Sequence, residues 1–137
     1  MGARTLAYDD VAVGDVGPAT ASPLTRTDLV MYAGASGDFN PMHHDEVAAQ
    51  AAGLPSVFGH GMYTAGLLAT AVTGYIGVGN LRSYRVRFTR QTWPGEVLTT
   101  HVAVREKRAG NEVVLDCSVV NEHGETKIRG EVVAVLP

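Results

Sequence analysis

A long uncharged run in the middle of the chain constrains the fold most. From Gly61 to Leu81, twenty-one consecutive residues carry no formal charge, a length at which a transmembrane helix must be considered. Glycines and threonines dilute the hydrophobicity of this run and break up its end. We therefore predict a helix of roughly four turns that is buried by a sheet, and no contact with a membrane. Its small residues would let strands approach the helix axis closely.

The pattern changes to a period of two after this run, which predicts strands. Tyr84, Val86 and Phe88 fall on one side of a first strand, and Arg85 and Arg87 fall on the other. Three further alternating segments follow, separated by turn-forming residues, at 96–107, 112–120 and 126–136. Consecutive hairpins predict an antiparallel meander. A helical first half followed by a run of strands is typical of an α+β fold, and we expect residues 1–137 to form one domain.

The first third of the chain predicts short elements. A strand is expected over 20–24. Thr25 and Asp28 match a capping box, in which side chains bond to first-turn amides, and predict a helix over 26–35. Asp45 can cap a second short helix. The chain between these two helices must then be a loop.

This loop contains the most informative polar residues of the chain. Asp38 and His43 lie five positions apart in a segment that cannot be regular structure, because Pro41 lacks a backbone donor and biases Asn40 away from helix. Gly37 permits backbone angles that are closed to other residues. A carboxylate and an imidazole held together in this way suit proton-transfer chemistry. The alternative is that Asp38 caps a turn and His43 is an ordinary loop residue.

Composition and charge narrow the class of protein. Eleven basic and fourteen acidic side chains give no reason to expect a nucleic-acid partner. The N-terminal residues lack the apolar core of a signal peptide, so we expect a cytoplasmic protein. Cys117 is the only cysteine. Because it alternates with apolar residues, we expect a buried strand thiol and not a nucleophile.

Three segments of the chain resemble one known family. Taken together, Tyr32–His43, Phe58–Met62 and Phe88–Glu96 resemble the MaoC-like dehydratases, or R-specific enoyl-CoA hydratases, and the resemblance covers nearly the whole chain. Its core is the motif Gly-Asp-x-Asn-Pro-x-His, which here begins at Gly37. The resemblance implies a hot-dog fold, in which an antiparallel sheet wraps around a central helix at about residues 61–75.

The resemblance also implies a reaction. In that family an aspartate and a histidine activate a water that adds to the β-carbon of a trans-2-enoyl thioester, and the product is an R-3-hydroxyacyl thioester. By motif match these roles fall to Asp38 and His43, and Asn40 would orient the pair or the water. No cofactor is implied, since coenzyme A or acyl carrier protein is part of the substrate. The reverse reaction is dehydration.

Residues around the start of the central helix are implied as further site residues. The backbone amide of Gly61 matches the family position that stabilises negative charge on the thioester oxygen. His60 is expected to support the turn, and we take it with Met62 and Tyr63 as candidate substrate contacts. One position departs from the family: a serine that some members carry on the central helix is Ala69 here, so its hydroxyl is absent or replaced by Thr70.

Arginines on the first long strand allow two interpretations. Arg85 and Arg87 belong to a cluster without an intervening acid, together with Arg82 and Arg90. The cluster could bind the phosphates of coenzyme A or the acidic surface of a carrier protein. The alternative, which we favour, is a solvated outer strand face.

Three rival functions are considered. A metal site could be drawn from His43, His44, Asp45 and His60, but adjacent histidines rarely reach one ion and we predict no metal. A hot-dog thioesterase would instead direct water at the carbonyl carbon. A subunit that needs a different partner for activity is the third alternative. For the chain itself we expect a homodimer or larger assembly, with heteromeric pairing as an alternative.

Overall fold

The computed structural model describes residues 6–137. Within these residues the elements along the chain are β1 (Thr20–Pro23), α1 (Arg26–Ser36), α2 (Glu46–Ala51), α3 (Gly61–Ile76), β2 (Leu81–Phe88), β3 (Val97–Arg108), β4 (Glu112–Val120) and β5 (Thr126–Val135). Short 3₁₀ turns occupy Tyr8–Asp10, Pro41–His43 and Val78–Asn80. The predicted order of helices and strands is confirmed.

The strands form one antiparallel sheet in the order β1-β3-β4-β5-β2. The predicted meander is confirmed for β3, β4 and β5. β2 lies outside the meander, because it pairs with β5 in the register Tyr84↔Val132. The segment between Phe88 and Val97 therefore carries the chain from one edge of the sheet to the other side, where β1 pairs with β3. β1 and β2 form the two edges.

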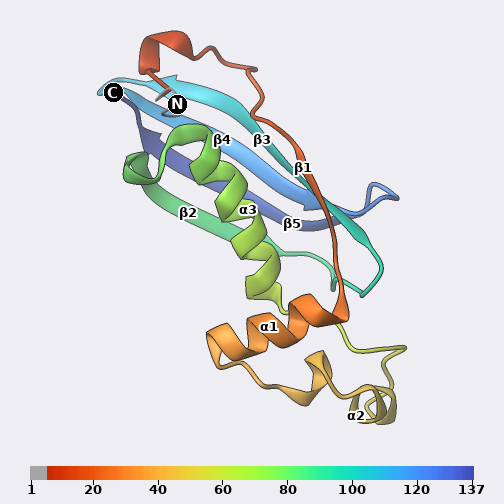
Figure 1. Cartoon of the computed structure of the whole chain (residues 1–137). Helices are drawn as coiled ribbons and strands as arrows, with labels where there is room; N and C mark the ends of the chain where they lie inside the picture. The colour runs from red at the N-terminus through yellow and green to blue at the C-terminus, as the bar shows by residue number, and fades with distance from the viewer. Residues whose placement is uncertain (1–5) are drawn as a thin grey trace.

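The central helix α3 lies along one face of the curved sheet (Figure 1). Ala65, Leu68, Val72 and Ile76 recur at helical spacing, and each is at most 2% exposed. They pack in one core with apolar residues of β3, β4 and β5. Full burial of a Leu or Ile side chain contributes about 1.5–3 kcal/mol, so this stripe fixes which face of α3 meets the sheet. The α+β hot-dog architecture predicted from the sequence is confirmed.

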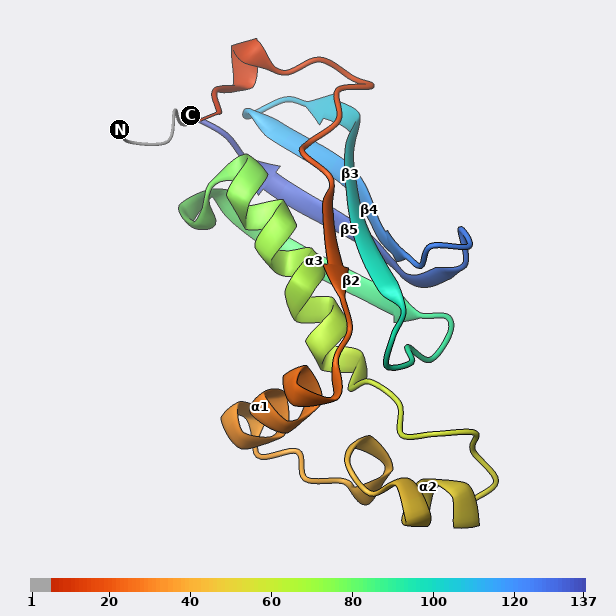
Figure 2. The same ribbon diagram turned by 45° about the vertical axis from the view of Figure 1, so that its right-hand side comes forward.

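The segment between β1 and α3 lies beyond the first turn of α3, away from the sheet (Figure 2). The predicted capping box begins α1: Thr25 Oγ1 accepts from the Asp28 amide at 3.1 Å, and Asp28 Oδ2 accepts from the Thr25 amide at 2.9 Å. α1 ends at Ser36 and is capped by Gly37, whose φ of 76° is in the left-handed region. The Asp45 side chain caps α2 as predicted. The caps at Gly37 and Asp45 therefore fix the two ends of the loop that carries Asp38 and His43.

Two further predictions can be compared with the fold. In the part of the chain that the structure describes, no helix combines the length and the apolar character needed to span a membrane. Cys117 is a buried free thiol on β4, as predicted. Burial raises the pKa of Cys117 to about 11, so the thiol is protonated and inert at neutral pH.

Candidate active site

His43 is oriented by the backbone of Phe58. Its Nδ1 lies 2.7 Å from the Phe58 carbonyl oxygen, and a carbonyl only accepts, so Nδ1 carries the proton. Nε2 of the neutral ring then holds the free lone pair. The ring also packs edge-on against the Phe58 ring, with centroids 4.8 Å apart. The structure therefore presents His43 with its basic nitrogen away from this contact.

Asp38 faces that nitrogen. Its Oδ2 lies 3.9 Å from His43 Nε2, which is too long for a direct hydrogen bond but lets one water contact both atoms. The side chain of Asp38 is 50% exposed, whereas that of His43 is 8% exposed. The solvent-exposed carboxylate of Asp38 and the nearly buried imidazole of His43 therefore face a single position that a small molecule such as water can occupy.

Asn40 shapes the turn between these two residues. Its Oδ1 accepts from the Met42 amide at 3.1 Å, which caps the 3₁₀ turn at Pro41–His43. Its own amide donates to Asp38 Oδ1 at 3.3 Å. Asn40 is therefore placed to orient both Asp38 and His43 through the backbone, while a role in orienting the water stays a prediction.

His60 contacts both His43 and Asp38. It is 1% exposed, its ring stacks on that of His43 at 3.9 Å, and its Nε2 donates to the Asp38 carbonyl at 3.1 Å. Burial lowers the pKa of His60, because the buried charged form would lose its hydration. A neutral His60 avoids placing a buried positive charge against the His43 ring.

Gly61 opens α3 directly after His60. The first amides of a helix have no intrahelical acceptor and carry the positive end of the helix dipole. In the described residues no backbone hydrogen bond is donated by the Gly61 amide. A Cβ at this position would lie 3.0 Å from the Phe88 ring. Glycine at position 61 therefore avoids a close contact with Phe88, and its amide remains a free donor; a role in stabilising a substrate oxygen stays a prediction.

The other two residues expected near the helix start differ in exposure. Met62 is 61% exposed. Tyr63 is partly buried, and its ring lies 5.6 Å from that of Tyr32, which in turn packs edge-on against His60 at 4.8 Å. Burial raises the pKa of Tyr63. Tyr32 and the carbonyl of Phe58 were not singled out from the sequence, although both lie within the segments that resemble the family.

Comparisons with known proteins identify the family of the chain. A family model described as "MaoC like domain" matches residues 13–125. The chain belongs to the MaoC-like domain family. The solved R-hydratase PhaJ1 from Pseudomonas aeruginosa has a TM-score of 0.89 at 29% identity, covering 97% of this chain and 86% of that chain.

Two curated relatives are similar over part of their length. The 3-hydroxyacyl-thioester dehydratase Y of Mycobacterium tuberculosis is 40% identical over 80 residues, which is 56% of this chain and 28% of that protein. The fatty acid synthase subunit beta of Aspergillus oryzae is 33% identical over 105 residues, which is 74% of this chain and 5% of that protein. This MaoC-like chain therefore spans a minor part of these relatives.

Thr70 is the candidate to replace the serine hydroxyl that is absent at Ala69. Thr70 Oγ1 donates to the Gly66 carbonyl at 2.9 Å, one turn earlier in α3. Its side chain lines a groove between α3 and the strands β1 and β3. The Thr70 proton is thus already engaged, which disfavours Thr70 as a substitute for the absent serine.

Arg85 and Arg87 lie apart from the dyad. Both side chains are on the exposed side of β2, opposite Glu131 and Arg129 of β5. No hydrogen bond or ion pair recorded for the described residues links either arginine to Asp38, His43 or His60. Their role in substrate binding stays a prediction, and the exposed outer strand face agrees with the alternative.

The residues that come together as potential metal ligands differ from the set considered above. Ligand atoms of Asp38, His43 and His60 lie within 4.8 Å of one another. His44 bonds to the Phe39 carbonyl at 3.1 Å, and Asp45 caps α2. The stacked rings of His43 and His60 are inclined by only 30°. Since imidazole lone pairs lie in the ring planes, nearly parallel rings do not direct both toward one ion.

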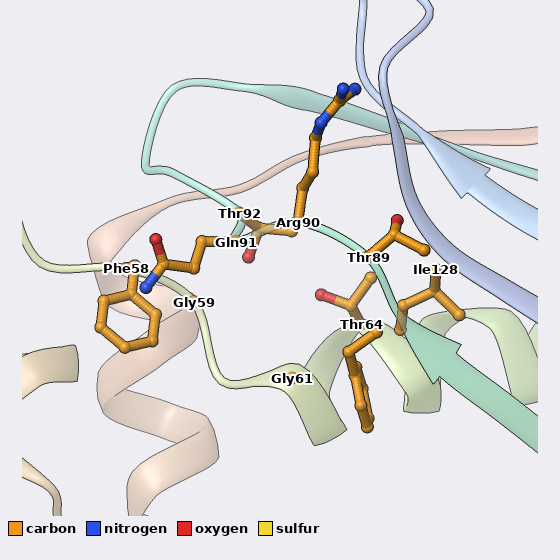
Figure 3. Close-up of a pocket in the computed structure, with 10 residues that line it drawn as sticks. Phe58, Gly59, Gly61, Thr64, Thr89, Arg90, Gln91, Thr92 and Ile128 are labelled. Atoms are coloured by element: carbon orange, nitrogen blue, oxygen red, sulfur yellow. The ribbon is translucent and has the colours of Figure 1, made fainter.

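A cavity of about 330 Å³ lies between the segment 58–61 and the segment 89–92 (Figure 3). Its wall includes Phe58, whose carbonyl orients His43, and Gly61, whose amide is free. The opposite wall is the segment 89–92 that follows β2. This cavity, which is open to solvent, therefore lies beside the start of α3, where the Gly61 amide is free.

Proposed function

We propose that this MaoC-like chain catalyses the reversible hydration of trans-2-enoyl thioesters, carried on coenzyme A or acyl carrier protein, to R-3-hydroxyacyl thioesters. The observation that carries the proposal is the arrangement of Asp38 Oδ2 and His43 Nε2, 3.9 Å apart, beside the start of α3. The likeness to an R-hydratase and to a 3-hydroxyacyl-thioester dehydratase supports it.

The proposed reaction begins with a water held by Asp38 and His43. His43 Nε2 accepts a proton from the water as the water oxygen bonds to the β-carbon of the enoyl group. The electron pair of the double bond moves toward the thioester, and negative charge develops on its oxygen. The Gly61 amide, fixed and positive, stabilises that charge. The dyad then returns the proton to the α-carbon. The hydroxyl group on the β-carbon and the new hydrogen on the α-carbon together account for one water.

The direct test is to incubate the purified protein with crotonyl-CoA and longer trans-2-enoyl-CoAs and to follow the absorbance of the conjugated enoyl thioester. The absorbance should fall, and chiral analysis should find the R-3-hydroxyacyl product, because a single dyad adds water from one face. An S product would contradict the assigned mechanism.

The same experiment separates the rival functions. Release of free thiol from a saturated acyl-CoA would identify a thioesterase, in which water attacks the carbonyl carbon. No reaction at any chain length, on coenzyme A or on carrier protein, would favour a subunit that needs a different partner. The free Nε2 of His43 could serve either attack, so the product decides between the two reactions.

A further inference from the structure

The position of the Asp38 carboxylate depends on the backbone of its loop. The side chain is 50% exposed, and within the described residues its carboxylate accepts from one amide, that of Asn40, at 3.3 Å. His43 is held more firmly, because it is 8% exposed and its Nδ1 bonds to the Phe58 carbonyl. In the proposed reaction one water contacts both Asp38 Oδ2 and His43 Nε2, which are 3.9 Å apart. Whatever fixes the Asp38 backbone therefore sets this gap.

Ser36, the last residue of α1, holds the backbone amide of Asp38. The Asp38 amide donates to Ser36 Oγ at 3.1 Å, and the Ser36 hydroxyl donates to the Tyr32 carbonyl at 2.7 Å. A hydroxyl has one proton to donate, so the bond to Tyr32 leaves the lone pairs of Ser36 for the Asp38 amide. The Ser36–Asp38 bond spans Gly37, where a φ of 76° turns the chain out of the helix. Ser36 thereby fixes the direction in which the chain leaves α1.

Tyr32, to which Ser36 bonds, packs against the residue that supports both members of the dyad. Its ring lies edge-on to that of His60 at 4.8 Å, and the His60 ring stacks on that of His43 at 3.9 Å. His60 Nε2 also donates to the Asp38 carbonyl at 3.1 Å. Both backbone polar groups of Asp38 are therefore bonded to the same group of packed residues that holds the His43 ring.

We propose that Ser36 is a positioning residue of the reaction, which sets the gap between Asp38 Oδ2 and His43 Nε2 by fixing the Asp38 amide. The inference rests on the proposed function, because it assigns Ser36 a part in placing the dyad of that function. The alternative is that Ser36 only stabilises the end of α1, since a helical serine hydroxyl readily bonds to the preceding turn. A purely stabilising hydroxyl would act on the helix whether or not Asp38 carries a carboxylate. The two roles therefore differ in how Ser36 depends on Asp38.

A double-variant cycle on initial rates with crotonyl-CoA tests this dependence. Ser36→Ala should lower kcat about tenfold and change KM by less than about twofold, because a misplacement of about 1 Å can cost about 100-fold in rate. In the Asp38→Asn protein, which has no carboxylate to misplace, Ser36→Ala should lower kcat by less than about twofold, since residues that act through one group are not additive. An equal loss of kcat in both backgrounds, or no loss in Ser36→Ala alone, would overturn the proposal.

Matched variants separate the bond to Asp38 from a general effect of helical hydroxyls. Ser36→Thr keeps the hydroxyl and should keep the wild-type kcat. Thr73→Val removes a hydroxyl that bonds to the preceding turn of α3 at 2.8 Å, as Ser36 does in α1, and no hydrogen bond recorded for the described residues joins Thr73 to the dyad. Its kcat should also be unchanged. A loss in Ser36→Thr or in Thr73→Val equal to that in Ser36→Ala would contradict the assignment.

Amide hydrogen exchange, followed by NMR, distinguishes failure of this inference from failure of the proposed function. The Asp38 amide should exchange about tenfold faster or more in Ser36→Ala than in the wild type and Ser36→Thr, because it loses its acceptor. The Gly37 amide bonds to the Ala33 carbonyl at 2.9 Å and should exchange equally in all three.

Equal acceleration at Gly37 and Asp38 would show that Ser36 stabilises the helix end, and the inference would fail. Acceleration at Asp38 alone, in a protein that hydrates no enoyl thioester, would leave Ser36 as the residue that places Asp38 and would refute the proposed function. Hydration with equal losses of kcat in the two backgrounds would support the proposed function and refute the inference.

Discussion

The two residues of the dyad differ in what holds them, although they act on the same water in the proposed reaction. His43 is fixed by the Phe58 carbonyl and by stacking on His60. Asp38 is half exposed and is held through the loop backbone, by its amide to Ser36 Oγ and by its carbonyl to His60. Substitution of Asp38 should therefore disturb the fold less than substitution of His43.

Removal of either proton-transfer group should abolish most of the activity. Asp38→Asn and His43→Gln keep side-chain size, and each should lower kcat by about 100-fold or more, since general acid–base catalysis contributes that much. The double variant should be little slower than the slower single variant, because the two groups act as a unit. Initial rates with crotonyl-CoA measure this, and circular dichroism controls for folding. Near-wild-type rates in both single variants would remove the proposed mechanism.

His60 should make stability depend on pH. Its pKa is lowered in the folded protein, so below about 6.5, the ordinary pKa of histidine, the unfolded chain binds a proton more readily than the folded one. This term of the free energy of unfolding is fully present above pH 6.5 and declines as the pH falls toward the folded pKa.

Urea unfolding between pH 7.5 and 5 should show this decline. His60→Gln, which does not titrate, should reduce the slope of stability against pH in that range, although the variant itself is expected to be less stable. His123→Gln, at a side chain that is 72% exposed, is the matched control and should leave the slope almost unchanged. An identical slope in the wild type and His60→Gln would contradict the assigned neutral state.

At the scale of elements, the segment between β2 and β3 is anchored by a buried ion pair. Lys127 Nζ lies 2.8 Å from Glu96 Oε2, with side chains 3% and 12% exposed. Lys127 also donates to the Gln91 carbonyl at 2.9 Å, and Glu96 Oε1 accepts from the Trp93 amide at 2.6 Å. The Gly59 amide donates to the Thr92 carbonyl at 2.8 Å. The pair thus fixes the segment that holds the chain around Phe58 and Gly59.

Breaking this pair should cost stability. Lys127→Met keeps the length of the side chain but leaves the Glu96 charge buried without its partner, which should lower the free energy of unfolding by about 3–5 kcal/mol. Urea unfolding measures the loss. Arg108→Met removes a cation from the exposed pairs with Glu106 and Glu112 and should have a far smaller effect. Equal effects of the two substitutions would show that burial of Lys127 is not decisive.

Gly59 should be intolerant of any side chain. Because its Cβ would collide with Thr92 Oγ1, Gly59→Ala should lower the free energy of unfolding by about 1–3 kcal/mol, the usual cost of overpacking. Gly34→Ala is the control, since nothing lies within 4 Å of a Cβ there and the position is inside α1. It should be neutral or stabilising. A stable Gly59→Ala protein would mean that the segment after β2 can move.

At the scale of the whole molecule, several exposed apolar side chains lie on the elements around the dyad. Val30 and Met31 of α1, Phe39 beside Asp38, and Met62 of α3 are each more than 60% exposed. β2 and β1 also leave two open sheet edges. Apolar surface and free strand edges are both features that proteins cover by association.

We therefore keep the prediction of at least a homodimer. Light scattering should give a mass of twice 14.5 kDa or more. A monodisperse monomer that still hydrates crotonyl-CoA would contradict this expectation. A monomer without activity would instead favour pairing with a different chain.

The sequence by itself determined the local elements and the loop that carries the candidate site. Local patterns predicted the capping box at Thr25, the cap at Asp45 and the apolar stripe of α3. Each of these features depends on residues that are only a few positions apart in the sequence. The motif that contains Asp38 and His43 likewise lies in one short loop. The family, and through it the hot-dog fold, followed from such local segments.

Only the tertiary structure decided which distant segments meet. It placed β2 beside β5, stacked His60 on His43, set the Phe58 carbonyl against Nδ1 and buried Lys127 against Glu96. Nothing in the alternation of β5 distinguishes Lys127 from the exposed Arg129, because the segment that covers Lys127 comes from more than thirty residues earlier in the chain. Contacts of this kind depend on packing the whole sheet around α3, and local patterns do not encode them.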